Sequence, residues 1–285
     1  MLSVEQMLIF AALMLKRWLV ELDQDRRAFR SFAARCSLSE RLDVLMLAEP
    51  DAELQRRAAS IQAQIEQADE RFFQRVRERL RRRMFTRAGM ILSLTRYAAR
   101  ETASPGYAPL DVLLAGVLDA GELPDELPCS PEMVAYQPAP GRIILALLEQ
   151  LRPGDVFYDL GSGLGRVVIA AALLSTVRAK GVEFQPTFCE YSAHAAAGVN
   201  VQAEFIAMDA REAELADGDV FFLYTPFRGA LLQSVLMRLQ AIAEHKPIRV
   251  CTFGPCTPEV ARATWLELHT GSLDPEQLAV FRSKT

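Results

Sequence analysis

The chain has 285 residues and a net charge of −4, with 51% hydrophobic and 24% charged residues. This composition is typical of a globular protein and excludes a disordered chain, a fibre and a small disulfide scaffold. Residues 1–110 carry 19 Lys and Arg against 14 Asp and Glu, whereas residues 111–285 carry 13 against 22. We therefore expect two regions: a helical accessory region over 1–110 and an α/β domain over 141–285, joined by a Pro-rich strap over 111–140.

Helices are predicted for the first region because Pro50 is its only proline before the first glycine, Gly89. Apolar residues recur every three or four positions over 4–22 and again over 54–84. The second stripe predicts a helix over 51–85, about 50 Å long at 1.5 Å per residue. Such a helix is typical of a helical hairpin or of a dimer element, so a homodimer through 51–85 is one expectation.

The end of this predicted helix is rich in arginine. One interpretation is a solvated face paired with Glu70 and Glu78, and the other is a patch for an anionic partner such as nucleic acid, acidic protein or lipid head groups. The arginines concerned are Arg71, Arg75, Arg77, Arg79, Arg81, Arg82, Arg83 and Arg87.

The chain is expected to be cytoplasmic. Its apolar N-terminal run over 6–15 ends at Lys16 and Arg17, so it is shorter than the roughly 20 residues of a membrane span. The positive charge follows the run, whereas a signal peptide has it before. A helix lying in the membrane plane is the alternative. Five scattered cysteines and three histidines indicate reduced thiols and predict no metal centre.

From residue 142 onward predicted strands and helices alternate, which indicates an open parallel α/β sheet. The predicted strands are 156–160, one ending at 181–184, 203–208, 219–224 and 248–253, with two more candidates at 264–269 and 278–282. The predicted helices are 143–151, 166–174, one beginning at 186, and 229–243.

A glycine-rich loop follows the first of these strands, with the sequence Asp-Leu-Gly-Ser-Gly-Leu-Gly over 159–165. Gly161, Ser162, Gly163 and Gly165 allow close approach of backbone to a ligand, at the edge where an open sheet binds nucleotides. Arg166 stands where a dinucleotide fingerprint requires its third glycine. A carboxylate at Asp159 would repel a pyrophosphate, but it suits the amino group and the sulfonium of S-adenosylmethionine.

Two further acids follow the next strands in order. Glu183 ends the second strand, where a carboxylate can accept hydrogen bonds from both ribose hydroxyls. Asp209 and Ala210 end the third strand, where a side chain and a backbone N–H can bind the adenine edge. Together, Asp159, the glycine loop, Glu183 and Asp209 follow one another in this order. The four features indicate a nucleotide-like cofactor more strongly than the glycine loop alone.

Residues 136–255 resemble the class I, seven-strand S-adenosylmethionine-dependent methyltransferases, with motif similarity to the non-SET histone lysine methyltransferases. The resemblance implies a Rossmann-like sheet of seven strands, the last one antiparallel, flanked by helices, and S-adenosylmethionine as cofactor. It also implies that Tyr136 lies near the cofactor. Those histone enzymes carry Asn-Asn after the fourth strand, whereas this chain has Tyr224-Thr225-Pro226-Phe227, so the acceptor stays open.

The end of the fourth strand borders the acceptor pocket in this fold. Tyr224 can hydrogen-bond the acceptor or act as a weak base, or it packs over the cofactor without proton chemistry. Thr225 stands where enzymes that methylate a planar amine carry Asn or Asp. Phe227 is the candidate aromatic wall of the pocket, and Arg228 is a candidate for attracting an acidic acceptor. Asp217 and Asp219 precede this strand, so no metal is expected there.

Three hypotheses follow. The first is an enzyme that transfers a methyl group from S-adenosylmethionine to an unidentified acceptor. The second is a non-catalytic module that binds the cofactor or no longer does so, whose helical region engages a partner. The third is a dinucleotide-dependent oxidoreductase, against which Asp159 and Arg166 both argue.

Overall fold

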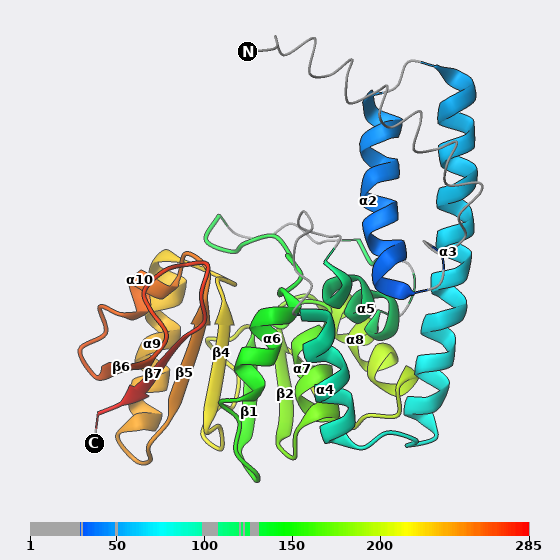
Figure 1. Ribbon diagram of the computed structural model, residues 1–285. Coiled ribbons are helices and arrows are strands. Elements are labelled where there is room, and N and C mark those ends of the chain that lie inside the picture. Colours follow the sequence, from blue (N-terminus) through cyan, green and yellow to red (C-terminus); the bar gives the residue numbers. More distant parts are fainter. Residues whose placement is uncertain are drawn as a thin grey trace. The chain divides into compact units, whose positions relative to one another are not determined.

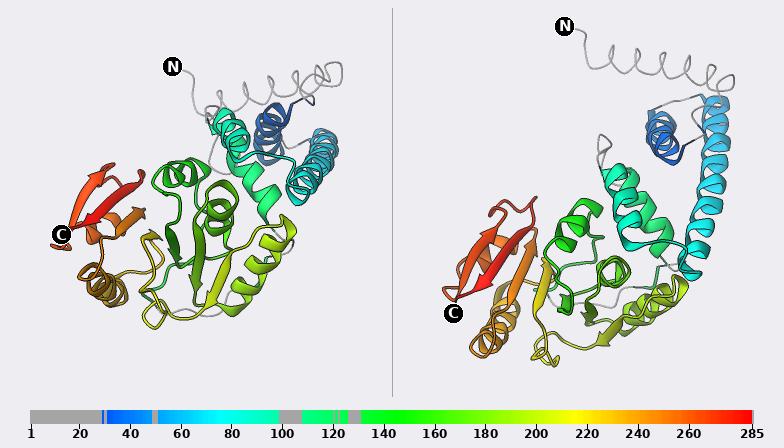
Figure 2. Two further views of the ribbon diagram at one scale, coloured as in Figure 1. Left: turned by 90° about the horizontal axis from the view of Figure 1, so that it is seen from below. Right: turned by 60° about the horizontal axis from the view of Figure 1, so that its bottom comes forward.

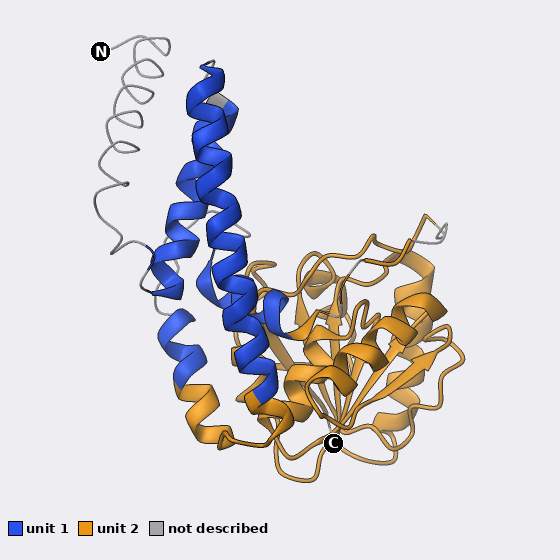
Figure 3. Cartoon of the chain, turned by 90° about the vertical axis from the view of Figure 1, so that its right-hand side faces the viewer, with its two compact units in different colours: residues 1–78, 93–117 blue, residues 79–92, 118–285 orange. Residues whose placement is uncertain are grey.

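The structure is a computed structural model that describes residues 29, 31–48, 51–98, 108–119, 121, 123–125 and 131–284 (Figure 1). The predicted apolar stripe over 4–22 and Cys129 lie outside these ranges. The chain divides into two compact units, one of residues 1–78 and 93–117 and the other of residues 79–92 and 118–285 (Figure 3). No helix of the described part of the chain is both long and apolar enough to cross a membrane.

The first unit is built on a pair of helices, α2 (Phe32–Ala48) and α3 (Ala52–Arg81). Their apolar faces meet within the chain, so α2 covers residues 54–65 of the predicted stripe and the hairpin interpretation is the one observed. A homodimer through 51–85 stays a prediction. The buried residues of this contact are Leu38, Leu42 and Leu45 of α2 with Ala58, Ile61 and Ile65 of α3.

The predicted helix over 51–85 is too long at its end, because α3 stops at Arg81. Arg83 adopts a left-handed backbone conformation with φ of 54°, which ends a right-handed helix. Met84, the last residue of the predicted stripe, is therefore exposed outside the helix. The helices α4 (Arg87–Ala98) and α5 (Pro109–Leu118) follow.

A buried ion pair also joins α2 to α3 in the first unit. The Arg35 Nε donates to Asp69 Oδ1 over 2.6 Å, and both side chains are nearly inaccessible. Burial raises the pKa of the Asp69 carboxyl, and the Arg35 guanidinium opposes this. The pair is flanked by stacked aromatic rings, with Phe32 5.1 Å from Phe72.

The second unit contains a seven-stranded sheet in the order β3-β2-β1-β4-β5-β7-β6. The pairs among β1 to β5 are parallel, and β7 runs antiparallel to both of its neighbours. This confirms the predicted α/β class and the antiparallel last strand. The strands are β1 (Val156–Leu160), β2 (Arg178–Glu183), β3 (Glu204–Ala207), β4 (Val220–Tyr224), β5 (Arg249–Phe253), β6 (Leu266–Thr270) and β7 (Ala279–Ser283).

Helices cover both faces of this sheet (Figure 2). They are α6 (Gly141–Leu148), α7 (Arg166–Leu174), α8 (Pro186–Gly198), α9 (Gly229–Ala243) and the short α10 (Thr257–Val260). The bounds of α7 and α9 agree with the sequence prediction. α6 begins two residues earlier than predicted, directly after Pro140, whose fixed φ suits a position before the first turn.

Burial explains why β1 and β4 lie at the centre. All five residues of β1 and the first four of β4 are buried, as expected for parallel strands covered on both faces. The strand order reverses between β1 and β4, which is the position where open sheets bind ligands beyond the carboxyl ends of their strands. The loops after β1, β2, β3 and β4 therefore lie together at the carboxyl-terminal ends of the strands, which we call the site edge of the sheet.

Candidate functional site

The glycine loop leaves β1 with three left-handed residues. Gly161, Gly163 and Gly165 have φ of 80°, 52° and 75°, a region that residues with a Cβ rarely adopt. The backbone N–H groups of Gly161 and Ser162 donate to the Val182 carbonyl over 2.8 and 3.0 Å. The loop is therefore fixed to β2 before α7 begins at Arg166.

Each of these glycines also lies where a side chain would clash. A Cβ at Gly161 would meet Pro226 of the loop after β4, and a Cβ at Gly163 would overlap the ring of Tyr136. At Gly165 it would lie 2.6 Å from Ser192 Oγ. Ser162 packs its own side chain against Gly181 of β2, and its buried Oγ has no hydrogen-bond partner in the described part of the chain.

Two carboxyl groups lie at this loop. Asp159 is 3% exposed, and its pKa is raised well above the usual range by burial and by the negative charge of Glu183. The Glu183 Oε2 accepts the Gly163 N–H over 2.8 Å, and its Oε1 accepts the Gln185 N–H over 3.0 Å. The site therefore concentrates negative charge in a buried place, which suits a ligand that brings a cation.

Asp209 lies after β3 and is held by Arg211. The Arg211 Nη2 donates to Asp209 Oδ2 over 2.7 Å, and this hydrogen bond lowers the pKa of the Asp209 carboxyl. The neighbouring Ala210 is buried in the core of the sheet. The structure thus brings Asp209 and Ala210 to the same edge as Asp159 and Glu183.

The segment 131–140 crosses this edge as an extended strap. Val134 N–H donates to the Pro226 carbonyl over 3.1 Å, and Arg228 N–H donates to the Glu132 carbonyl over 2.9 Å. The strap thereby pairs with the residues that follow β4. It carries Tyr136 to Gly163, and the Tyr136 ring meets the Phe188 ring edge-on with centroids 6.0 Å apart.

The strap is held by a residue that sequence reasoning missed. Glu132 accepts the N–H groups of Ala230 and Leu231 over 2.8 and 3.1 Å, so its carboxylate caps the first turn of α9. Glu132 and α9 are about a hundred positions apart, and a capping residue so distant leaves no pattern in the sequence. The cap explains how a proline-rich segment keeps one path over the site.

Arg166 is a second residue whose structural partner the sequence did not indicate. Its Nη2 donates to both carboxyl oxygens of Asp119 over 3.0 and 3.2 Å. Burial raises the pKa of the nearby Tyr136 phenol to about 12, with Arg166 and Asp119 acting in opposite directions. Tyr136 is therefore a neutral hydroxyl at neutral pH.

Tyr224 ends β4 beside the strap. Its ring lies 4.8 Å from the Phe253 ring, and its hydroxyl is 3.4 Å from Gln137 Oε1. Burial and the negative charge of Glu276 raise the pKa of the Tyr224 phenol, and Arg142 opposes them. The hydroxyl is therefore a hydrogen-bond donor and a poor base at neutral pH.

Thr225 has a left-handed backbone with φ of 41°. Its Oγ1 donates to the Phe253 carbonyl and accepts the Cys256 N–H, each over 3.1 Å. The hydroxyl therefore joins the end of β4 to the end of β5, and a catalytic role for Thr225 stays a prediction.

The other two predicted acceptor residues differ in exposure. Phe227 is buried within the core of the sheet and forms an isolated bridge with Met133 of the strap. Arg228 is exposed just before α9. As acceptor-binding residues, both stay predictions.

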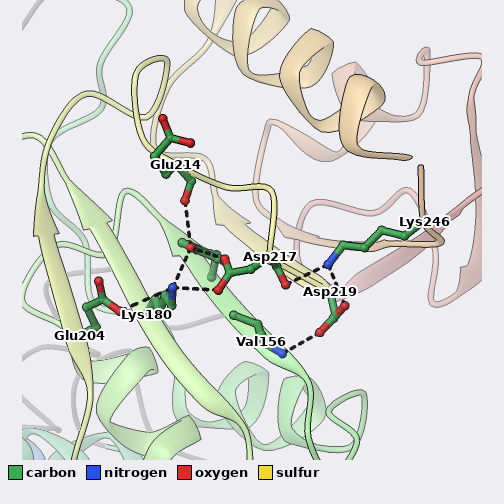
Figure 4. Close-up of polar contacts among 8 residues, drawn as sticks. Val156, Lys180, Glu204, Glu214, Asp217, Asp219 and Lys246 are labelled. Atoms are coloured by element: carbon green, nitrogen blue, oxygen red, sulfur yellow. Dashed lines mark hydrogen bonds and ion pairs between the residues drawn. The ribbon is translucent and has the colours of Figure 1, made fainter. Parts of the chain in front are cut away.

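The two acids before β4 have structural partners at the opposite edge of the sheet (Figure 4). Asp217 Oδ2 accepts from Lys180 Nζ over 3.0 Å, and Asp219 Oδ1 accepts from Lys246 Nζ over 3.0 Å. The Tyr158 hydroxyl donates to Asp217 Oδ1 over 2.7 Å. These contacts tie the loop before β4 to β1 and β2. Within the described residues no group of three His, Cys, Asp or Glu side chains could hold a metal ion.

Comparison with known proteins adds one family match. Residues 143–231 match the sequence model of a family described as "Histone methylation protein DOT1". This segment contains the glycine loop, both acids of the first two strands and the end of β4. Together with the seven-stranded sheet, the match confirms the predicted resemblance. The second unit has a class I methyltransferase fold. No curated protein matches the chain.

Solved structures with a similar sheet include several methyltransferases. A tRNA (uracil-54, C5)-methyltransferase of Pyrococcus abyssi in complex with S-adenosyl-L-homocysteine has 19% identity and a TM-score of 0.41, over 50% of this chain and 38% of that one. An RNA methyltransferase of Salinibacter ruber, also in complex with S-adenosyl-L-homocysteine, has 27% identity and a TM-score of 0.38, over 52% of this chain and 92% of that one. Magnesium protoporphyrin IX methyltransferase of Synechocystis PCC 6803 has 13% identity and a TM-score of 0.39, over 50% and 77%.

Proposed function

We propose that the chain binds S-adenosylmethionine at the glycine loop and transfers its methyl group to an acceptor. The observation that carries this proposal is the buried pair of carboxyl groups, Asp159 and Glu183, at a loop built from left-handed glycines. In the described part of the chain, Glu183 is the one charged group that acts on the Asp159 carboxyl, and it is also negative. A ligand with an ammonium and a sulfonium supplies the missing positive charge.

The residues present fit this cofactor at each of its parts. Asp159 would accept a hydrogen bond from the cofactor's amino group. The Gly163 and Gln185 N–H groups hold the Glu183 carboxylate at the end of β2, where it would accept hydrogen bonds from the two ribose hydroxyls. Asp209 and the Ala210 N–H would bind the adenine edge, and Tyr136 covers the glycine loop.

The cofactor supplies an electrophilic methyl group on a sulfonium, and the protein contributes alignment and exclusion of water. Tyr224 stays protonated at neutral pH, so it orients the acceptor by donating a hydrogen bond and does not take its proton. The acceptor atom would therefore have to arrive neutral or already deprotonated, so that its lone pair could bond the methyl carbon while the sulfonium–methyl bond breaks and S-adenosylhomocysteine leaves. The strap and Tyr136 keep water from the methionine end of the site.

The proposal is tested by calorimetric titration of the full chain with S-adenosylmethionine and S-adenosylhomocysteine. We expect micromolar binding of both, lost in Asp159→Ala and in Gly163→Asp. Glu267→Ala, which removes an exposed acid of the edge strand β6, is the control and should bind normally. Absence of binding to a chain that circular dichroism shows to be folded contradicts the proposal.

The acceptor is tested separately by release of S-adenosylhomocysteine in the presence of candidate acceptors. Histone peptides belong in this screen because of the description of the matched family. Tyr224-Thr225-Pro226-Phe227 stands where the histone enzymes carry Asn-Asn, so small molecules, nucleic acids and lipids belong in it too. Tyr224→Phe should lower turnover and leave cofactor affinity unchanged.

A further inference from the structure

A strongly basic segment lies outside the cofactor site, at the end of α3 and the start of α4. Five arginines and no acidic residue lie between Arg79 and Leu92. Arg79 lies over the Phe85 ring at 4.3 Å. Within the described part of the chain, the side chains of Arg83 and Arg87 form no ion pair and no hydrogen bond. The charges of Arg83 and Arg87 are therefore not neutralised within the described part of the chain.

The segment has a defined structure. Arg81 Nε donates to the Gly198 carbonyl at the end of α8 over 2.6 Å, and Asn200 Nδ2 donates to the Arg81 carbonyl over 3.0 Å. Met84 N–H closes the turn by donating to the Arg79 carbonyl over 2.9 Å. The turn is thus fixed to the end of α8 within the second unit, with Arg83 and Met84 exposed on it.

Large aliphatic side chains accompany these arginines at the surface. On α4, Met90, Leu94 and Tyr97 are half-buried and mark the inner face. The outer face contains Leu92, which is 58% exposed, and Arg96 one turn further along the same helix. Met84 on the preceding turn is also 58% exposed. None of the residues of α4 is buried.

We propose that exposed side chains of the α3–α4 segment, namely Arg79, Arg83, Met84, Arg87 and Leu92, bind the surface of an anionic lipid bilayer. Arginine head groups pair with lipid phosphates while their stems and the neighbouring Met84 and Leu92 enter the interface between head groups and acyl chains. Nucleic acid would use the arginines but has no need of the exposed aliphatic side chains. The combination of the two favours a membrane surface.

The test is sedimentation of the full chain with vesicles of phosphatidylcholine alone or mixed with phosphatidylglycerol. Two double variants separate the contributions: Arg83→Ala with Arg87→Ala, and Met84→Ser with Leu92→Ser. The matched controls are Arg178→Ala with Arg262→Ala, both exposed arginines, and Leu123→Ser with Met237→Ser, both exposed aliphatic residues of the second unit. Circular dichroism verifies that every variant is folded.

We expect binding to the anionic vesicles only. The arginine variant should weaken it about 30-fold, the aliphatic variant about tenfold, and the controls should leave it unchanged. Equal binding to neutral vesicles, or no binding to anionic ones, overturns the proposal. It is also overturned if the aliphatic variant binds as the unaltered chain does and a single-stranded RNA competes for the arginines, because the surface then binds polyanions. None of these outcomes bears on the proposed cofactor site, because titration with S-adenosylmethionine tests that site separately.

Discussion

Three constraints act on Gly163: its backbone conformation, its packing against Tyr136 and its place beside the proposed ligand. Its φ is positive, its N–H donates to Glu183, and the Tyr136 ring occupies the space of a Cβ. A side chain here moves Tyr136 and removes the space in which backbone approaches the cofactor. The same backbone conformation without these contacts occurs at Gly154, which has φ of 88° and no atom near its missing Cβ.

This pair of glycines gives a matched prediction. Gly163→Ala should lower the affinity for S-adenosylmethionine at least about 100-fold, whereas Gly154→Ala should leave it unchanged. Gly154→Ala should lose about 1–2 kcal/mol of stability, because it places a Cβ in the left-handed region, and Gly163→Ala should lose more, because its Cβ also overlaps the Tyr136 ring. Calorimetry and thermal unfolding measure the two effects. Equal cofactor affinities in the two variants would mean that the glycine loop does not approach the ligand.

Asp159 should stabilise the bound state at the expense of the ligand-free fold. An acid whose pKa is higher in the folded than in the unfolded chain contributes stability below its unfolded pKa, and this contribution is lost as pH rises through the folded value. Because burial and Glu183 raise the pKa of Asp159, the ligand-free protein should lose stability as pH rises above the ordinary range of aspartate.

Asp159→Asn removes this titration. The variant should unfold at a higher temperature than the unaltered chain at pH 8 and differ less at pH 4, while its cofactor affinity falls at least tenfold. Thermal unfolding at both pH values and calorimetry decide this, with Glu267→Gln as the control. A variant that is less stable at pH 8 would show that Asp159 has a favourable partner in the ligand-free state.

At the scale of elements, the strap over 131–140 shows how a segment without helix or strand becomes ordered. Its backbone pairs with the residues after β4, and Glu132 caps α9. The strap then delivers Tyr136 to the glycine loop. Its three prolines, Pro131, Pro138 and Pro140, predict an extended path but not the surface on which that path lies.

The cap gives a prediction at this scale. Glu132→Ala should destabilise the second unit by about 1 kcal/mol, the usual effect of removing a helix cap. It should also weaken cofactor binding, because Tyr136 loses its support. Urea unfolding and calorimetry measure both changes, and Glu190→Ala, an exposed glutamate on α8, is the control. A stability loss without any change in affinity would show that the strap does not depend on the cap.

At the scale of the whole molecule, each unit has a hydrophobic core of its own within the described residues. One lies between α2 and α3 and includes the buried Arg35–Asp69 pair, and the other lies around the seven-stranded sheet. The proposed cofactor residues all belong to the second unit. A ligand that binds only the folded state raises stability at its own site.

Hydrogen exchange can therefore separate the two units. Saturating S-adenosylhomocysteine should slow exchange in β1, β2 and β4, whereas exchange in the described parts of α2 and α3 should stay the same. Arg35→Met should speed exchange in α2 and α3, because it leaves the Asp69 carboxylate buried without its partner. Protection of α2 and α3 by the ligand would show instead that the two units are energetically coupled.

The sequence by itself determined the alternation of strands and helices, the antiparallel end of the sheet through a family resemblance, and the order of acids and glycines along one edge. These features are local, since strand period, glycine conformation and helix starts depend on neighbouring residues. Thus Val156–Leu160 and Arg166–Leu174 have the predicted bounds.

Only the tertiary structure decided which distant residues meet. The end of α3 at Arg81, the capping of α9 by Glu132, the bonds of Thr225 to the β5 loop and the burial of Phe227 all depend on packing between elements far apart in the chain. Hydrogen bonds and buried surface of this kind form only when these elements pack together, so no pattern among neighbouring residues predicts them.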